Sequence, residues 1–360
     1  MKNELKYFEG CLLGGAIGDA LGAPVEFRRY EQIIEEYGEE GVTELIAAPG
    51  GKEALITDDT QMTMFTVEGI LRSITRAKRK GIAWDKSDIT HTMFRAYLRW
   101  LYTQGLNTPH WAEKDYDGYL VRLKKLHAYR EAGITSITAL GKGIKGSVAH
   151  PINDSKGCGG LMRIAPIGLV KLNEDVFEIG CEVAAITHGG PCAYLPAGTL
   201  AMIINELLKG VEITYAIENA VQRLRLEPES KECVDVIEKA LVLIEEDEIT
   251  REKIESLGEG IFAHEALAMA LYIAGSTIRH TKGDRKDIKV ALCKAVNHSG
   301  GSDIVGAITG QLLGAYYGIE KMENLFEVPV ELEKEIRDLA RDLYTLYEDT
   351  PGWLKKYPAW

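Results

Sequence analysis

The chain has 360 residues, in which 42 Lys and Arg stand against 54 Asp and Glu, giving a formal net charge of −12 at pH 7. Such a surface repels nucleic-acid backbones and anionic membranes, so we expect neither as a partner. Hydrophobic residues make up 46% of the sequence and no low-complexity tract interrupts them, which predicts one globular domain over residues 1–360. The best apolar run, residues 266–275, falls short of the roughly 20 residues of a membrane span, and we expect a cytoplasmic protein.

The cysteines form no C-x-x-C pair, the spacing that is common in structural zinc sites. We therefore expect reduced, mostly buried thiols and no zinc site, as is usual in the cytosol. The six cysteines are Cys11, Cys158, Cys181, Cys192, Cys233 and Cys293.

The first predicted helix covers residues 5–22 and contains the glycines Gly10, Gly14, Gly15, Gly18 and Gly22. Each glycine in a helix costs roughly 1 kcal/mol relative to alanine, so tertiary packing has to favour this helix. Its flat face suits the close approach of another backbone. Pro24 and the glycines end the helix and leave Glu26 on the turn beyond it.

A polar stretch with one short predicted strand, residues 42–47, leads to the sequence Thr57-Asp58-Asp59-Thr60. The helix that follows ends at Gly81, after three basic residues that suit the negative end of the helix dipole. Two interpretations of the acidic sequence are open. Thr57 or Asp58 suits a helix N-cap, and the same dense set of oxygens suits a hard cation such as Mg²⁺, Ca²⁺ or Mn²⁺.

Residues 88–104 form the next predicted helix, whereas 105–156 are less regular and predict a short helix with long loops, which a lid or an insert would explain. The sequence Gly157-Cys158-Gly159-Gly160 follows, with Arg163 close behind. Three glycines in four positions allow positive φ angles and a nest of backbone N–H groups that binds an anion, with Arg163 as a nearby cation. A plain tight turn is the alternative.

From residue 175 the pattern is almost entirely helical, and His188 lies where the first of these helices ends. No set of alternating strands occurs, so the predicted fold class is all-α, a compact orthogonal bundle of many helices. The predicted helices cover residues 175–188, 193–209, 212–225, 229–246, 264–275, 285–297, 303–318 and 329–347. Residues 348–360 form an aromatic tail that covers either the body of the protein or a partner.

Glycines also recur every four residues late in the chain, at Gly306, Gly310, Gly314 and Gly318. This spacing lines one face of a helix with hydrogen atoms, so that another helix can press close. The glycine-containing helix at 5–22 is the natural candidate. Their packing would bring Asp303, at the start of the late helix, near the turn that joins residues 19 and 26.

Five motifs occur in one order along the chain: Gly18-Asp19-Ala20-Leu21-Gly22 with Glu26, Thr57-Asp58-Asp59-Thr60, Gly157-Cys158-Gly159 with Arg163, Thr187-His188 and the segment 297–318. Taken together and in this order, they resemble the motifs of the ADP-ribosylglycohydrolase family, which includes the dinitrogenase-reductase-activating glycohydrolases. The resemblance implies an all-α fold with two metal ions, usually Mg²⁺ or Mn²⁺, in a central cleft. It also implies hydrolysis of the glycosidic bond between ADP-ribose and a protein side chain, often arginine.

The resemblance also assigns roles to residues of this chain. The metal ligands would be Thr57, Asp58, Asp59 and Asp303, and the catalytic carboxylates would be Asp58, Asp59 and Glu26. The substrate-binding residues would be Gly157, Cys158, Gly159, Gly160, Arg163, His188 and Asp19. The partner would be an ADP-ribosylated protein or a small molecule that contains ADP-ribose.

One departure from the family pattern concerns the second metal. Aligned on the glycine at 306, Gly301 and Ile304 stand where the family usually has an aspartate and a hydroxyl residue that ligate this metal. We therefore expect one secure metal site and a weak or empty second one. Two alternatives stay open: a regulatory protein that binds ADP-ribose without turnover, and a hydrolase of another ADP-ribose ester or nucleotide-like glycoside.

Overall fold

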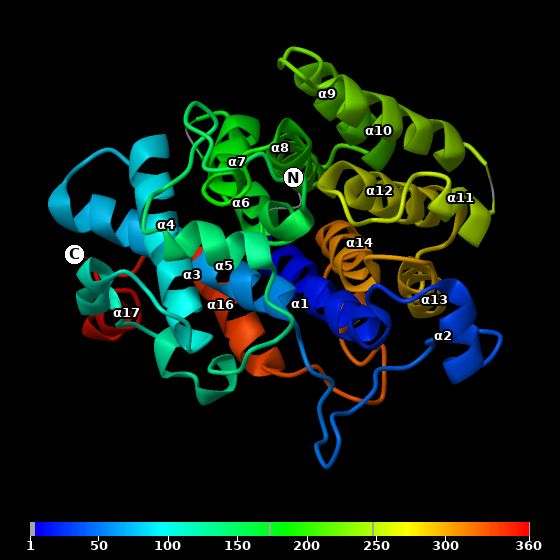
Figure 1. Ribbon diagram of the computed structural model, residues 1–360, viewed down its shortest axis with the longest axis horizontal. Helices are drawn as coiled ribbons and strands as arrows, with labels where there is room; N and C mark the ends of the chain where they lie inside the picture. Colours follow the sequence, from blue (N-terminus) through cyan, green and yellow to red (C-terminus); the bar gives the residue numbers. More distant parts are fainter. Residues whose placement is uncertain (1–3, 173, 247, 360) are drawn as a thin grey trace.

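The computed structural model describes residues 4–172, 174–246 and 248–359, and within these it contains 17 α-helices and no strand. This confirms the predicted all-α fold class (Figure 1). The α-helices are α1 (Leu5–Gly22), α2 (Tyr30–Tyr37), α3 (Asp58–Lys80), α4 (Lys86–Thr103), α5 (Ile134–Gly141), α6 (Ala165–Leu169), α7 (Val176–Ala185), α8 (Pro191–Lys209), α9 (Ile213–Leu224), α10 (Lys231–Ile244), α11 (Arg251–Glu255), α12 (Ala263–His280), α13 (Arg285–Val296), α14 (Ser302–Tyr317), α15 (Ile319–Met322), α16 (Glu333–Thr345) and α17 (Pro351–Lys356).

Helices α1 and α14 pack against each other at the centre of the molecule (Figure 1). Their glycines face each other in register, because Gly10, Gly14 and Gly18 of α1 meet the backbone of Gly314, Gly310 and Gly306. A Cβ atom added at Gly10 would lie 2.5 Å from the carbonyl oxygen of Gly314, a distance that real Cβ atoms essentially never show. The predicted contact between the two glycine-rich helices is therefore confirmed.

The same contact places α14 beside the end of α1. A Cβ atom added at Gly22 would lie 2.5 Å from the Cα atom of Asp303, so the start of α14 touches the last residue of α1. The backbone N–H of Phe27 donates to the carbonyl of Gly300, 2.8 Å away, which extends this junction beyond the turn at Glu26. The expected approach of Asp303 to the turn at residues 19–26 is confirmed.

Helix α3 begins and ends where its sequence predicts. Thr57 caps the N-terminus by accepting a hydrogen bond from the backbone N–H of Asp59 over 3.2 Å, and Gly81 ends the helix with a left-handed φ of 63°. Glycine adopts this conformation without the steric cost that a Cβ atom brings. The capping interpretation of the acidic sequence is thus confirmed, and it does not exclude a metal.

One local expectation was wrong, and five short helices were missed. Residues 42–47 do not form a strand, because only Ala47 makes an isolated bridge, to Ala54, across the turn that contains Gly50. The short helices α2, α6, α11, α15 and α17 were not foreseen. Helices of four to eight residues are too short to show a helical period clearly, so only their tertiary packing defines them.

The less regular segment 105–156 contains α5 and the 3₁₀ helices η2 (His110–Asp115), η3 (Leu120–Arg122) and η4 (Lys124–Leu126). The predicted short helix with long loops is therefore present. Residues 130–133 of this segment reach the acidic loop: the backbone N–H of Asp58 donates to the carbonyl of Arg130 over 3.1 Å. The segment thus contributes directly to the surroundings of the candidate site.

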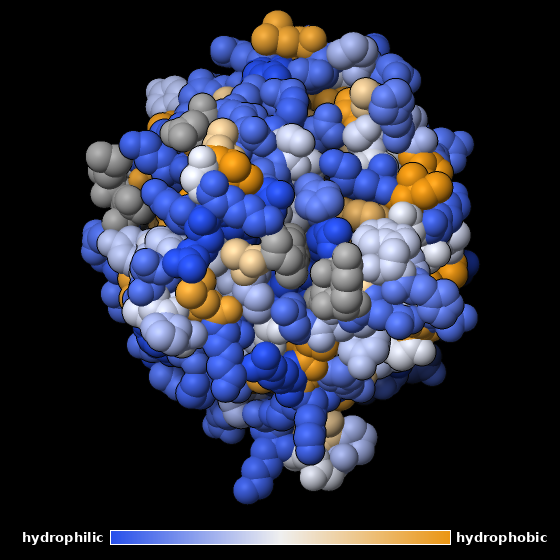
Figure 2. All heavy atoms as spheres, turned by 90° about the vertical axis from the view of Figure 1, so that its left-hand side faces the viewer, coloured by the Kyte–Doolittle hydropathy of each residue, from blue (hydrophilic) through white to orange (hydrophobic). Residues whose placement is uncertain are grey.

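The aromatic C-terminal tail covers the body of the protein. Trp353 and Tyr357 are buried, and the Trp353 indole donates to the hydroxyl of Thr75 on α3 over 2.9 Å. Trp360 lies outside the described residues. Figure 2 shows the face on the left of Figure 1, which is mainly hydrophilic with apolar side chains in separate small groups. Among the described residues, no helix is both long and apolar enough to cross a bilayer.

Candidate metal centre and substrate site

Asp19 of α1 holds the loop that precedes α3. Its buried carboxylate accepts hydrogen bonds from the hydroxyl of Thr57 over 2.7 Å and from the backbone N–H groups of Thr57 and Thr60 over 3.0 and 3.2 Å. The Thr60 hydroxyl is a fourth donor. We expected Asp19 to contact the substrate, but its oxygens are already used by four donors of this loop. Asp19 instead positions the acidic residues.

Three further carboxylates converge next to this loop and are almost fully buried. Asp58 is 6% exposed, Asp59 is 3% exposed and Asp303 is 2% exposed. Burial raises the pKa of Asp58 to about 8, and it also raises the pKa values of Asp59 and Asp303 well above their ordinary range. Repulsion adds to burial, and for Asp59 the charge of Asp303 is the largest such contribution. The structure therefore brings Asp58, Asp59 and Asp303 together, as predicted.

Glu26 lies at the edge of this acidic cluster and is only partly buried. Burial, together with the neighbouring charges of Glu131 and Asp19, raises the pKa of Glu26 to about 7. A carboxyl group with a pKa near 7 can either give or take a proton at neutral pH. Glu26 is therefore a half-buried carboxyl group that titrates near neutral pH, in contrast to the buried Asp58, Asp59 and Asp303.

A divalent cation would balance the charge of these buried carboxylates, although the carboxylate oxygens of Asp58, Asp59 and Asp303 do not all lie within 4.8 Å of one another. Asp59 Oδ2 is buried and has no hydrogen-bond partner within the described part of the chain, and Asp58 accepts a hydrogen bond from the backbone N–H of Gly133 over 3.1 Å. Several buried carboxylates without a compensating charge are unfavourable, and a hard cation with oxygen ligands removes this cost. A cavity of about 10 Å³ borders Asp59, Thr60 and Gln311, and it is about large enough for one water molecule.

The glycine-rich sequence at 157–160 does not form a nest that relies on positive φ. Cys158–Gly160 form the 3₁₀ helix η5, and none of the four described residues has a positive φ. The glycines instead allow close packing, since a Cβ atom at Gly159 would lie 2.7 Å from Cε1 of His188. The tight turn, which was the alternative, is therefore what the chain adopts.

His188 and Arg163 lie behind this turn rather than on an open surface. His188 is buried, and burial together with the charge of Arg163 lowers the pKa of His188 to about 3, so its imidazole is neutral. Arg163 is fully buried; its guanidinium donates to the Thr187 hydroxyl over 2.7 Å and lies 4.0 Å from the ring centroid of Tyr97. We expected Arg163 to reach the phosphates of a substrate, but Thr187 and Tyr97 enclose its guanidinium group, which does not reach the protein surface.

A comparison with protein families decides the assignment, since a model of ADP-ribosylglycohydrolase matches residues 2–352. The chain belongs to the ADP-ribosylglycohydrolase family. It is 26% identical to ADP-ribosylhydrolase ARH3 of Bos taurus, over 96% of this chain and 94% of that one. It is 24% identical to the ADP-ribosyl-[dinitrogen reductase] glycohydrolase of Rhodospirillum rubrum, over 91% and 92% of the two chains.

A solved structure described as an ADP-ribosylglycohydrolase-related protein complex matches with a TM-score of 0.62 and 25% identity, covering 96% of this chain and 99% of the other. An uncharacterised protein of Archaeoglobus fulgidus is 27% identical over 94% of this chain and 96% of its own length. The predicted family is confirmed, and with it the predicted enzyme class, a hydrolase of the ADP-ribosylglycohydrolase type.

In this ADP-ribosylglycohydrolase the two positions that we expected to lack second-metal ligands lie at the start of α14, Gly301 as its N-cap and Ile304 in its first turn. Gly301 precedes Ser302, and a Cβ atom at Gly301 would lie 2.5 Å from the carbonyl oxygen of Gly260 and 3.8 Å from Cδ1 of Ile304. The Gly260 carbonyl therefore blocks a side chain at position 301, whereas Cδ1 of Ile304 lies at an ordinary contact distance from it. An aspartate at 301 requires the Gly260 segment to move.

Sequence reasoning missed two groups that shape the site. Gly133 contributes the backbone donor to Asp58, and Gln311 of α14 donates to the carbonyl of Met162 over 2.9 Å, which ties the glycine-rich turn to the central helix. A backbone donor leaves no signature in a sequence, because every residue except proline has one. Gln311 lies on the predicted glycine helix, where an amide between apolar residues is the signal that could have identified it.

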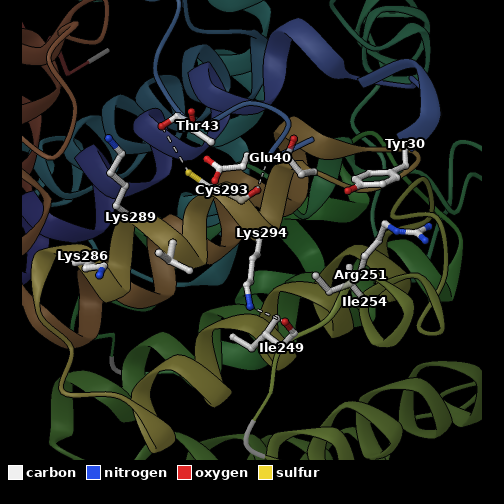
Figure 3. A pocket seen from close by; sticks show the side chains of 12 residues that line it. Tyr30, Glu40, Thr43, Ile249, Arg251, Ile254, Lys286, Lys289, Cys293 and Lys294 are labelled. Carbon is white, nitrogen blue, oxygen red and sulfur yellow. Dashed lines mark hydrogen bonds between the residues drawn. The ribbon is translucent and has the colours of Figure 1, made fainter. Parts of the chain in front are cut away.

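A separate pocket of about 510 Å³ lies between α13 and α11 and includes none of the predicted site residues (Figure 3). It is lined by Tyr30, Glu40, Thr43, Ile249, Arg251, Ile254, Lys286, Lys289, Val290, Cys293, Lys294 and Asn297. Three of its cations are already paired: Lys294 donates to the Ile249 carbonyl over 2.6 Å, Arg251 bonds Glu255 over 2.7 Å, and Lys289 bonds Glu44. Because its lining contains none of the predicted site residues, the pocket is distinct from the acidic cluster.

Proposed function

We propose that this protein is a metal-dependent hydrolase of the glycosidic bond between ADP-ribose and a protein side chain, with arginine as the favoured acceptor residue. The observation that carries the proposal is the set of buried carboxylates, Asp58, Asp59 and Asp303, with an unpartnered oxygen on Asp59. Family membership supports the chemistry, and two relatives are named for ADP-ribosyl hydrolysis. Helix α1, near the start of the chain, packs on α14 and α16, near its end. This packing supports a single catalytic domain, a helical bundle with the cleft inside it.

Thr57, Asp58, Asp59 and Asp303 would hold Mg²⁺ or Mn²⁺, which prefer oxygen ligands and supply positive charge that polarises a bound oxygen. Asp58 and Asp59 would orient a water molecule toward the anomeric carbon of the ribose. Glu26, whose pKa is raised by burial to about 7, would exchange a proton with the water or the leaving group near neutral pH. The carboxylates would also stabilise the positive charge that develops on the sugar in glycoside hydrolysis.

The turn Gly157-Cys158-Gly159-Gly160 would line the ADP-ribose site with its backbone, while His188 would hold this turn in place as a neutral imidazole. Asp19 and Arg163 would act at one remove, through the loop at Thr57 and through Thr187. Because Gly301 and Ile304 bring no side-chain oxygen, we propose one strong metal site and a weak second one. The segment 105–156 would contribute a lid through residues 130–133.

The proposal is tested by incubating the protein with peptides that carry ADP-ribosyl-arginine or ADP-ribosyl-serine, in Mg²⁺ or Mn²⁺ and in EDTA. We expect metal-dependent release of ADP-ribose, with arginine as the better substrate, and at least a hundredfold loss in Asp59→Asn. The control is Cys293→Ser, which lies in the separate pocket and should keep full activity. Gln311→Glu would not serve as a control, because Gln311 borders the small cavity next to Asp59. Failure to release ADP-ribose from either peptide, where a relative with the complete family motif succeeds, would refute the proposal.

The features at Gly301 and Ile304 favour one alternative, an ADP-ribose-binding regulatory protein without turnover. Calorimetry distinguishes the two, because that alternative gives ADP-ribose binding without hydrolysis. Activity gained in Ile304→Ser alone, or together with Gly301→Asp, would support it; the second change must also displace the Gly260 carbonyl. Small ADP-ribose esters and nucleotide sugars should be assayed in parallel, since turnover of these alone would indicate another glycoside as substrate.

A further inference from the structure

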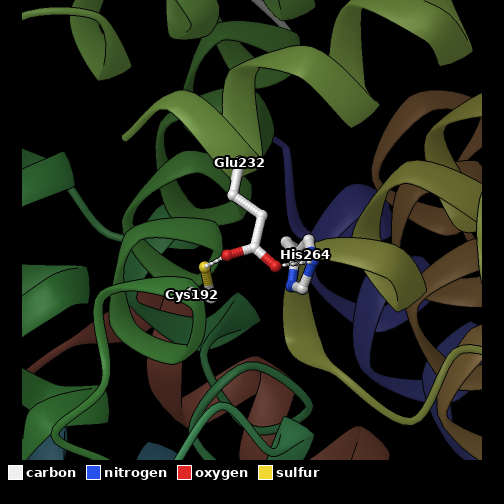
Figure 4. A group of neighbouring side chains, drawn as sticks. All are labelled: Cys192, Glu232 and His264. Carbon is white, nitrogen blue, oxygen red and sulfur yellow. Dashed lines mark hydrogen bonds and ion pairs between the residues drawn. The ribbon is translucent and has the colours of Figure 1, made fainter. Parts of the chain in front are cut away.

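A second group of possible metal ligands lies outside the acidic cluster, where three helices begin side by side. Cys192, Glu232 and His264 are the second residues of α8, α10 and α12, and their side chains point toward one another (Figure 4). The Cys192 thiol donates to Glu232 Oε2 over 3.1 Å, and His264 Nε2 lies 3.4 Å from Glu232 Oε1. The three ligand atoms all lie within 4.8 Å of one another.

Two of these three residues are buried in the fold, which distinguishes the group from polar side chains that meet on the surface. Cys192 is 3% exposed and His264 is 5% exposed, while the Glu232 side chain reaches solvent and leaves a route for entry. His264 Nδ1 is buried and has no hydrogen-bond partner among the residues that the structure describes. A buried imidazole nitrogen without a hydrogen-bond partner is unusual, and imidazole nitrogens are common metal ligands.

We propose that Cys192, Glu232 and His264 form a binding site for a zinc-like transition metal ion, separate from the oxygen-rich site proposed for Mg²⁺ or Mn²⁺. A thiolate, an imidazole and a carboxylate are zinc ligands, and such atoms stand roughly 3–4 Å apart around a tetrahedral ion. Binding replaces the thiol proton of Cys192, which leaves to solvent. The thiolate and the carboxylate then balance the two positive charges of the ion, and three helix N-termini stabilise these anionic ligands.

The same geometry shows what competes with the ion. Lys156 Nζ donates to Glu232 Oε2 over 2.7 Å, the oxygen that also accepts from Cys192. The metal must displace this ammonium group, whereas the nearby carboxylate of Glu265 favours a cation. Lys156 adjoins the glycine-rich turn, and its carbonyl accepts a hydrogen bond from Ala263 N–H over 3.0 Å, next to His264. The ion and the Lys156 side chain would therefore compete for the Glu232 carboxylate.

The test uses Co²⁺ as a spectroscopic substitute for zinc, added to the full-length reduced protein with excess Mg²⁺ to occupy the oxygen-rich site. A cobalt–thiolate bond gives a near-ultraviolet charge-transfer band, which oxygen ligands alone do not. We expect one cobalt per chain with this band, and displacement of the band by one equivalent of Zn²⁺. Cys293→Ser, which changes a thiol in the separate pocket, should leave the band unchanged.

Three variants give the decisive outcomes. Cys192→Ser should abolish the band, His264→Gln should weaken cobalt binding at least tenfold, and Lys156→Gln should tighten it several-fold by removing the competing cation. Circular dichroism and thermal melting of each variant check the fold, and zinc protection of Cys192 against alkylation in the unmodified chain gives a measurement that needs no variant. Absence of the band in the unmodified protein, a band that persists in Cys192→Ser, or no protection of Cys192 would overturn the proposal.

Discussion

Glu26 offers a direct test of the electrostatics of the acidic cluster, through the stability of the protein without metal. Because burial raises the pKa of Glu26 from 4.5 to about 7, the folded state binds one more proton than the unfolded state between these pH values. The free energy of unfolding therefore falls as pH rises through this window, by about 1.4 kcal/mol per pH unit, and the loss is complete above pH 7. The full window corresponds to ~3 kcal/mol, and solvent screening of this partly exposed group reduces it to about 1–2 kcal/mol.

Glu26→Gln removes the ionisable group and should stabilise the metal-free protein by this amount at pH 8, with no gain at pH 4.5. The assay is urea unfolding in EDTA at both pH values, with the change in midpoint converted through the measured slope. Glu9→Gln is the matched control, because the buried Glu9 carboxylate lies 3.5 Å from Arg341 and 3.9 Å from Arg337 and should lose stability. A Glu26→Gln protein that is no more stable than the unmodified one at pH 8 would refute the reasoning.

Three other variants separate metal binding, helix packing and substrate contact. Asp59→Asn should raise the melting temperature of the protein in EDTA and abolish the further rise that Mn²⁺ gives to the unmodified chain, as scanning calorimetry would record. Gly10→Ala should cost about 1–3 kcal/mol in denaturant unfolding because its Cβ atom meets the Gly314 carbonyl, whereas Gly141→Ala, with open space around it, should be neutral or stabilising. Arg163→Lys should lower stability by about 2 kcal/mol through its lost contacts with Thr187 and Tyr97, yet leave the ADP-ribose affinity measured by calorimetry unchanged.

The parts of the fold that the sequence predicted are those with a long, regular pattern. The glycine repeats in residues 5–22 and 306–318 predicted a close helix pair, and the pair exists because both stripes lack side chains at matching intervals. Helix α3 was bounded correctly by the Thr57 cap and by Gly81. Helices of a single turn or two, and the isolated bridge at Ala47, depend on contacts from distant parts of the chain, which no local pattern contains.

In the candidate site too, some residues could be predicted from local sequence patterns and others could not. Asp58, Asp59 and Asp303 were placed together from two helix starts, and the structure brings them together. Which polar side chains face inward was not predictable for Arg163 and Asp19, since both make hydrogen bonds to residues that are distant in sequence. The same limit applies to the zinc-like site that we propose: spacing rules detect ligands close in sequence, whereas Cys192 and His264 are 72 residues apart (264 − 192) and meet only because two helices begin side by side.

The glycine contact between α1 and α14 is structurally coupled to the acidic cluster. Asp19 lies one turn before Gly22, so the residue that orders the Thr57 loop belongs to the helix whose end touches Asp303. Any side chain at Gly18 or Gly22 would separate the two helices, and the separation would move Asp303 away from the carboxylates that Asp19 positions. Close packing of small residues therefore sets the distance between the two halves of the proposed metal site, and this packing offsets the mutual repulsion of the buried carboxylates.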